Sequence, residues 1–199
     1  IDFAGCPDMK LDAADNPDEV FELEKDDDGN APPIMAKDLP PDELRKLFTV
    51  HQGNWEVKDG ALAIDRKSNS VLHFNSPVVG DVSVEIHGKV LQDEIGELSV
   101  ITNAPQSPKR EYADDGYVFQ FGADNLSRTK ITRNGAEVFF VDADLVPGRD
   151  YSIRCEVREE ILSLTVNGEN LLQERDFFVL SGERCGLYGH APGTRIERV

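Results

Sequence analysis

The sequence predicts an all-β protein, built as a two-sheet antiparallel β-sandwich with a short N-terminal helix and an acidic arm. From Asn54 onward, apolar and polar residues alternate in short runs that turn residues interrupt about every eight to twelve positions. Asn134-Gly135 and Asn167-Gly168 separate such runs, and both positions of each pair tolerate the positive φ of a two-residue hairpin. These features favour many short strands over helices.

The first fifty residues differ in composition from the rest of the chain. They are acidic and rich in Pro, Asp and Asn, and only PPDELRKLF at 40–48 has the sequence of a helix start, with prolines and acidic residues before basic ones. We therefore expect an acidic arm over residues 1–50, with a short helix near 40–48 and packed on the sandwich. The sandwich itself is expected over residues 51–199.

The charge of the chain excludes some classes of partner. It has 21 basic and 38 acidic residues, a net charge of −17. Nucleic-acid affinity comes largely from Lys and Arg that neutralise phosphates, so we expect no nucleic-acid partner. No stretch of about 18 apolar residues occurs, so we expect no insertion into a membrane. The sequence does not indicate the oligomeric state.

The sequence has three cysteines, an odd and low number that does not suit a disulfide framework. Cys155 and Cys185 fall within expected strands, and buried thiols are the expectation for both. A bridge between them would require that their strands are neighbours and that the protein is exported. Residue 1 is Ile rather than Met, so either processing or a shortened sequence is expected. An extracytoplasmic or secreted location is favoured.

No cofactor is expected, although one acidic loop resembles a calcium site. In Asp26–Asn30, alignment on Gly29 places Met35 where an EF-hand requires a bidentate Glu, so this is not an EF-hand. A solvated acidic loop is the simpler interpretation, and non-canonical calcium binding is the alternative. The four histidines lack the short spacing of metal ligands.

Alternation along the strands predicts which side chains face outward. The outward set forms a polar sheet face that carries Glu85, His87, Gln120, Arg128 and Lys130. Aromatic rings can stack on sugars, so two further residues are candidates for the rim of such a face. They are Trp55, for which a core position is the alternative, and Tyr112 in an expected loop.

Several segments together resemble a known family. WEVKDGAL, VVGDVSVEI, GYVFQF, VPGRDYSIRCEVREEILSLTVNGENL and GERCGLYGHAPGTRIERV occur in an order similar to that of concanavalin A-like (laminin G-like) sandwich domains. More closely, this order resembles the bacterial 3-keto-disaccharide hydrolase-like family. The resemblance runs from about Asn54 to Val199 and implies a concanavalin A-like jelly roll.

The same resemblance is incomplete at the residues that would carry chemistry. Gln120 matches the glutamine of the family's Glu-x-Gln strand, but Val118 replaces its glutamate. The family's arginine position falls on Thr102 or Asn103 within GELSVITN. The chain thus has the scaffold without the carboxylate and guanidinium that suit acid–base work and charge stabilisation.

Three functions follow as hypotheses. The first is a non-catalytic carbohydrate-binding or surface-recognition domain that uses a polar concave sheet face, with a glycan as ligand and no catalytic residues. The second is a glycoside hydrolase or lyase of the 3-keto-disaccharide hydrolase type, for which the candidate residues are Glu85, His87, Glu97 and Asp124. The third is a structural module of a larger bacterial protein. Fold alone does not choose between them.

Overall fold

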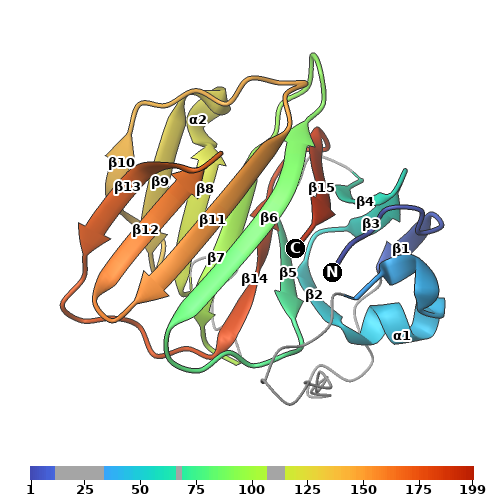
Figure 1. Ribbon diagram of the computed structural model, residues 1–199, viewed down its shortest axis with the longest axis horizontal. Helices are drawn as coiled ribbons and strands as arrows, with labels where there is room; N and C mark the ends of the chain where they lie inside the picture. Colours follow the sequence, from blue (N-terminus) through green and yellow to red (C-terminus); the bar gives the residue numbers. More distant parts are fainter. Residues whose placement is uncertain (12–33, 66–68, 107–114) are drawn as a thin grey trace.

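The chain forms two antiparallel β-sheets that pack face to face in a computed structural model, which describes residues 1–11, 34–65, 69–106 and 115–199 (Figure 1). Sheet A has eight strands, and its β6, β11, β12 and β13 lie in front of sheet B in Figure 1. Its strands in spatial order are β1 (Met9–Leu11), β3 (Trp55–Lys58), β4 (Ala61–Ile64), β15 (Thr194–Arg198), β6 (Val82–Val90), β11 (Tyr151–Arg158), β12 (Ile161–Val166) and β13 (Glu169–Arg175).

Sheet B has seven strands and forms the second layer. Its strands in spatial order are β10 (Ala136–Val141), β9 (Arg128–Arg133), β8 (Tyr117–Gly122), β7 (Leu98–Ala104), β14 (Arg184–Gly189), β5 (Ser70–Phe74) and β2 (Phe48–Gln52). The helical pieces are η1 (Ala36–Asp38), α1 (Pro41–Lys46) and α2 (Ala123–Leu126). The all-β sandwich and the short N-terminal helix are confirmed.

Two-residue turns connect neighbouring strands as the sequence predicts. Asn134 and Gly135 have φ of 48° and 81° between β9 and β10, and Asn167 and Gly168 have φ of 50° and 83° between β12 and β13. Positive φ at both positions matches the right-handed twist of the paired strands. Asp59 and Gly60 join β3 to β4 in the same way, with φ of 52° and 73°.

The core lies between the sheets and follows the predicted alternation. In β6, Val82, Val84, Ile86 and Val90 are buried, whereas the residues between them are more exposed. From sheet B, the ring of Phe121 meets that of Tyr151 on β11, edge to face with centroids 4.9 Å apart. Apolar burial on both inner faces supplies the main stabilising free energy of such a sandwich.

The described part of the expected arm is built into the sandwich. β1 pairs with β3 in sheet A, and β2 begins at Phe48 in sheet B. Phe3 is fully buried in the same core, and the backbones of Ile1 and Val199 hydrogen-bond to each other. Residues 1–11 and 34–50 therefore contribute strands and core side chains.

The cysteines are free and buried. Cys155 lies on β11 of sheet A and Cys185 on β14 of sheet B, so their strands are not neighbours. The expectation of buried thiols is confirmed. A disulfide bridge would require that β11 and β14 are neighbours, and the structure places them in different sheets.

Candidate functional site

The residues predicted to share one polar face lie on two different sheets. Glu85 and His87 belong to β6 of sheet A, whereas Gln120, on β8, belongs to sheet B. Arg128 and Lys130 on β9 are also in sheet B. The single shared face is thus a wrong expectation, because alternation tells inward from outward but not which sheet a strand joins.

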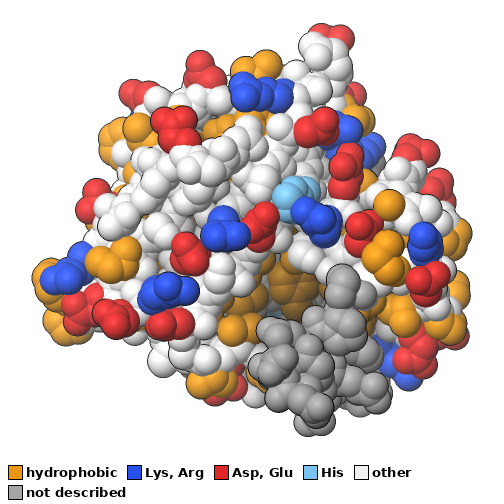
Figure 2. All heavy atoms as spheres, in the orientation of Figure 1, with side chains coloured by type: hydrophobic (Ala, Val, Ile, Leu, Met, Phe, Trp, Pro, Cys, Tyr) orange, Lys and Arg blue, Asp and Glu red, His pale blue; other side chains and the backbone are white. Residues whose placement is uncertain are grey.

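The outer face of sheet A carries paired charges. Glu85 accepts hydrogen bonds from Arg154, with Nη2 at 2.7 Å, and from the Ser152 hydroxyl at 3.1 Å. The hydrogen bond from Arg154 holds the pKa of Glu85 below its usual value. His87 contacts both Glu85 and Arg198 through Nε2. Figure 2 shows this face, with acidic and basic side chains interspersed around a histidine.

Trp55 is a core residue and not part of a ligand-binding rim. Its side chain is 1% exposed, and its indole N–H has no hydrogen-bond partner. The core alternative weighed for this residue is therefore correct, as is usual for large aromatics. Tyr112 and the acidic loop at Asp26–Asn30 lie outside the described residues.

Gln120 lies in a row of side chains across the outer face of sheet B. The register of five neighbouring strand pairs places these residues opposite one another in the order Lys130, Gln120, Ser99, Tyr188, Val71 and Gln52. Ser99 is fully buried and its hydroxyl lacks a partner, whereas Gln120 and Tyr188 on either side are partly exposed. Two larger side chains thus flank a small one on one sheet face.

The carboxylate of Glu97 organises one end of this row. Glu97 is 1% exposed, and it accepts a hydrogen bond from Nε2 of Gln120 at 2.8 Å. Its other oxygen lies 2.9 Å from Nδ1 of His190, which follows β14. We name Glu97, Ser99, Gln120, Tyr188 and His190 the Gln120 cluster.

The carboxylate also fixes how its neighbours are oriented. An ionised carboxylate only accepts hydrogen bonds, so Gln120 must present its NH₂ group to Glu97 and its carbonyl oxygen away from it. By the same argument, His190 presents an Nδ1–H to Glu97. One buried acid therefore fixes an amide and an imidazole in single orientations.

Three residues of the cluster, Ser99, Tyr188 and His190, had not been predicted. Tyr188 lies on β14, where Cys185 and Leu187 are buried in the core, so the alternation of GERCGLYGH could have placed Tyr188 outward. Its hydroxyl donates to Asn69 at 3.0 Å. Ser99 carries no recognisable signal in sequence. Glu97 had been proposed only for the hydrolase hypothesis.

The predicted basic residues of β9 are held in ion pairs beside this cluster. Lys130 lies 3.3 Å from Asp124, a residue of the α2 turn. Arg128 lies 3.5 Å from the same carboxylate, and its guanidinium lies 4.5 Å from the ring centroid of Phe140. Arg128 and Lys130 therefore lie on the same outer face of sheet B as Gln120, and their role in ligand binding stays a prediction.

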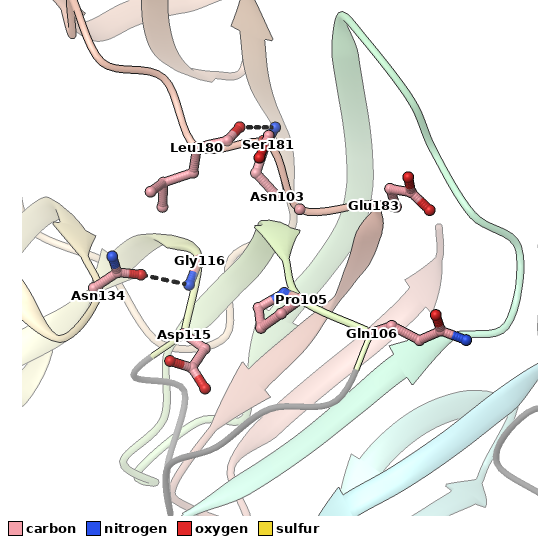
Figure 3. Close-up of a pocket in the computed structure, with 10 residues that line it drawn as sticks. Asn103, Pro105, Gln106, Asp115, Gly116, Asn134, Leu180, Ser181 and Glu183 are labelled. Atoms are coloured by element: carbon pink, nitrogen blue, oxygen red, sulfur yellow. Dashed lines mark hydrogen bonds between the residues drawn. The ribbon is translucent and has the colours of Figure 1, made fainter.

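A pocket lies at the other end of β7. It has a volume of about 440 Å³, and loop residues between strands form most of its lining. Figure 3 shows Asn103, Gly116, Asn134 and Leu180 around it, joined by the hydrogen bonds from Asn103 to Leu180 and from Gly116 to Asn134. The side-chain oxygen of Asn103 is buried without a partner. None of the predicted ligand-binding residues that the structure describes lines this pocket.

The described part of the chain contains neither a cluster of metal ligands nor a membrane-spanning helix. Across residues 1–11, 34–65, 69–106 and 115–199, no three His, Cys, Asp or Glu side chains lie close enough together to hold a metal ion. No helix within those residues is long and apolar enough to cross a membrane.

Comparison with known proteins shows similarity in structure and not in sequence. No family model matches the chain, and no curated protein matches it. A carbohydrate-binding module, CBM66, from Bacillus subtilis is similar with a TM-score of 0.61 and 12% identity, over 75% of this chain and 91% of that one. A Bacillus subtilis protein of unknown function with a galectin-like fold has a TM-score of 0.60 and 11% identity, over 77% and 88% of the two chains.

The carbohydrate recognition domain of Emp46p is similar as well, with a TM-score of 0.62 and 9% identity, over 80% of this chain and 89% of that one. At such low identities these structures show the fold and not the activity. The protein has a lectin-like, concanavalin A-like β-sandwich fold, as the sequence resemblance implied. The narrower resemblance to the 3-keto-disaccharide hydrolase-like family is not supported, since no family model matches.

Proposed function

We propose that the protein is a non-catalytic carbohydrate-binding domain whose ligand site is the Gln120 cluster on the outer face of sheet B. The observation that carries the proposal is the buried carboxylate of Glu97, which orients both Gln120 and His190. The similar folds of a carbohydrate-binding module and of a carbohydrate recognition domain support the same class of function.

The cluster contains the groups that sugar recognition requires. The carbonyl of Gln120 accepts a hydrogen bond from a sugar hydroxyl, and the second N–H of its amide donates one. The ring of Tyr188, across Ser99 from Gln120, offers an apolar surface for the C–H face of a pyranose. Because Glu97 holds the polar groups in place before binding, little side-chain entropy is lost when the ligand binds.

A glycan-array screen on purified protein, with and without calcium, tests this proposal. We expect binding to at least one glycan by the wild type and at least tenfold weaker binding by Gln120→Ala. Gln173→Ala is the matched control, since Gln173 is an exposed residue of β13 in sheet A. Glu183→Gln probes the pocket of Figure 3, which Glu183 lines.

The outcomes separate the alternatives. Loss of binding in Gln120→Ala alone supports the Gln120 cluster as the site, whereas loss in Glu183→Gln alone moves the site to the pocket. The absence of binding to any glycan overturns carbohydrate recognition and favours the structural module. Equal loss in the Gln173→Ala control would mean that the assay responds to general damage.

A glycoside hydrolase is the second candidate, because Glu97 and His190 form a carboxylate–imidazole pair beside Gln120. Retaining hydrolysis needs a second carboxyl about 5–5.5 Å away, and inversion needs one at about 6.5–9.5 Å. The carboxylate of Glu97 accepts hydrogen bonds from Gln120 and His190, and the Gln120 cluster as defined contains no second carboxylate. Release of an aryl leaving group from chromogenic glycosides, abolished in Glu97→Gln, would favour the enzyme.

A further inference from the structure

Three basic side chains gather on the outer face of sheet B, one on the strand of Tyr188 and the others on the two strands that follow it in the sheet, β5 and β2. His73 of β5 lies opposite Gly186 of β14, and Arg184 is two residues along β14 on the same face. The ring of His51, from β2, contacts the ring of His73 with centroids 4.3 Å apart. We name Arg184, His73 and His51 the basic cluster.

Gly186 brings these side chains together. A Cβ atom at this position would lie 2.8 Å from Cδ2 of His73 and 2.2 Å from the carbonyl oxygen of Leu72. The missing side chain therefore lets the imidazole lie over β14, between Arg184 and Tyr188. The close approach of β5 and His73 to β14 explains why a glycine occurs inside a strand at this position of CGLYG.

Two polar atoms of the basic cluster are buried without hydrogen-bond partners. Arg184 is 5% exposed and His73 is 3% exposed, and neither Nη1 of Arg184 nor Nδ1 of His73 has a hydrogen-bond partner. In the part of the chain that the structure describes, no carboxylate forms an ion pair with Arg184. In a protein with a net charge of −17, this is an unusual environment for a guanidinium.

A buried guanidinium without a counter-ion is unfavourable, and arginine does not relieve this by losing its proton. Histidine can, and burial with the nearby charges of His51 and Arg184 lowers the pKa of His73 to about 3. Burial first, and then Arg184, also lowers the pKa of His51. At neutral pH, the cluster thus has one fixed positive charge and two neutral imidazoles, and a bound anion would favour their uptake of a proton from solvent.

We propose that Arg184, His73 and His51 form a binding site for an oxyanion, namely the carboxylate or sulfate group of an acidic glycan. A planar guanidinium binds such groups in a bidentate manner, and the unpartnered Nδ1 of His73 supplies a further polar contact. His51 is the exposed member of the cluster and provides the approach from solvent.

This inference rests on the proposed carbohydrate function, because it adds that the glycan bound by the Gln120 cluster carries a negatively charged group. Tyr188 and Arg184 are four residues apart on β14, which is about 13 Å along a strand. The apolar side chains of Val71, Ile101, Val118 and Ala104 form a separate cluster on this face, and Tyr188 packs against it. A short oligosaccharide that follows β14 would extend from the Gln120 cluster to the basic cluster.

Titration of the full chain with three probes tests the proposal: sodium glucuronate, uncharged glucose and sodium sulfate. The readouts are the ring-proton NMR signals of His51 and His73, and calorimetry. We expect glucuronate and sulfate to shift both signals and glucose to leave His51 and His73 unchanged. Bound anions favour protonated imidazoles, so the affinity for glucuronate should rise as the pH falls from 7 to 5.

Arg184→Met should weaken binding of glucuronate at least tenfold without unfolding the protein, because it removes a buried charge that has no partner. Arg184→Lys keeps the charge but loses the planar fork, and should weaken binding several-fold. The matched control is Arg175→Met on β13 of sheet A, where an exposed arginine pairs with Glu160 at 3.7 Å. This control should bind as the wild type does.

The results distinguish this inference from the proposed function. Unchanged histidine signals with both anions, or unchanged affinity in Arg184→Met, would overturn the anion site even if neutral glycans bind at Gln120. A response to sulfate without a response to glucuronate would overturn the carboxylate as the bound group and support a sulfate group. A response to glucuronate that persists in Gln120→Ala would support the anion site independently of the Gln120 cluster.

Discussion

The amide nitrogen of Gln120 lies 2.8 Å from a carboxylate oxygen of Glu97, and this one contact connects a buried acid to a partly exposed amide. Glu97 immediately precedes β7, and Gln120 lies within β8, so antiparallel pairing of these strands brings the two side chains together. The carboxylate can only accept, and the amide is therefore held in one orientation. The described contacts of Gln120 make it part of a hydrogen-bonded cluster and not an isolated polar residue.

Gln120→Glu should destabilise the protein at pH 7, because it places a second carboxylate against Glu97. The substitution replaces the amide donor of Gln120 by a second negative charge, so neither carboxylate has a donor from the other. We expect this to lower the free energy of unfolding by about 1–3 kcal/mol. Urea unfolding measures this, and the loss should shrink as the pH falls and one carboxyl takes up a proton. Gln173→Glu, an exposed change on β13, should stay within about 0.5 kcal/mol of the wild type.

Much of the fold could be predicted because it depends on local rules. The positive φ at Asn134-Gly135 and the alternation of β6 follow from turn chemistry and from the period of a strand, and both occur in the structure. Which strands join which sheet depends on contacts between distant segments. For this reason the sequence correctly predicted that Glu85 and His87 face outward, but the prediction that they lie on the same sheet face as Gln120 was wrong.

The candidate site was harder to predict because its members come from distant segments. Glu97 and His190 are 93 residues apart and meet only through the pairing of β7 with β14. Arg184 and His73 look like ordinary strand residues in sequence, because the residues around them do not indicate that their polar atoms lack hydrogen-bond partners. Gln120 carried a signal through its outward parity on an otherwise apolar strand, and the alternation around Tyr188 offered another.

Acid should destabilise the protein through His73. Its pKa falls from 6.5 to about 3 on folding, so between these values the unfolded chain binds more protons than the folded one. The free energy of unfolding therefore falls as the pH is lowered through this range, by up to about 1.4 kcal/mol per pH unit from this group. Above pH 6.5 the histidine is neutral in both states and contributes no slope.

Urea unfolding at pH 7, 6, 5 and 4 measures this slope, with His73→Phe as the comparison. The phenyl ring fills a similar volume and does not titrate, so the slope between pH 6 and 4 should become less steep. An equally steep slope in His73→Phe would show that other groups cause the acid sensitivity. His51 is one such group, because its pKa is also lowered.

Trp55 should matter for stability and not for ligand binding. It is 1% exposed in the core, so Trp55→Ala should cost about 3–5 kcal/mol in the free energy of unfolding. The indole N–H has no partner, and Trp55→Phe therefore loses no hydrogen bond and should cost less than half as much. Glycan binding by folded Trp55→Phe should equal that of the wild type, and a selective loss of binding would return Trp55 to the ligand site.

The three thiols should resist modification until the chain unfolds. Burial raises the pKa of Cys155 well above its usual value and that of Cys185 to about 11, and burial also raises the pKa of Cys6. The thiolate is the reactive form, so native protein at pH 8 should react slowly with a disulfide reagent. In urea, three thiols should react at once.

The rates in native buffer show which opening exposes each thiol. Cys155 has no exposed surface on β11, inside sheet A, so its modification should require global unfolding and follow the unfolding equilibrium across urea concentrations. Cys6 is 7% exposed near the N-terminus, and its modification should require only local opening. Cys6→Ser should therefore remove the fastest phase. A fast phase that survives in Cys6→Ser would mean that a sheet opens locally around Cys155 or Cys185.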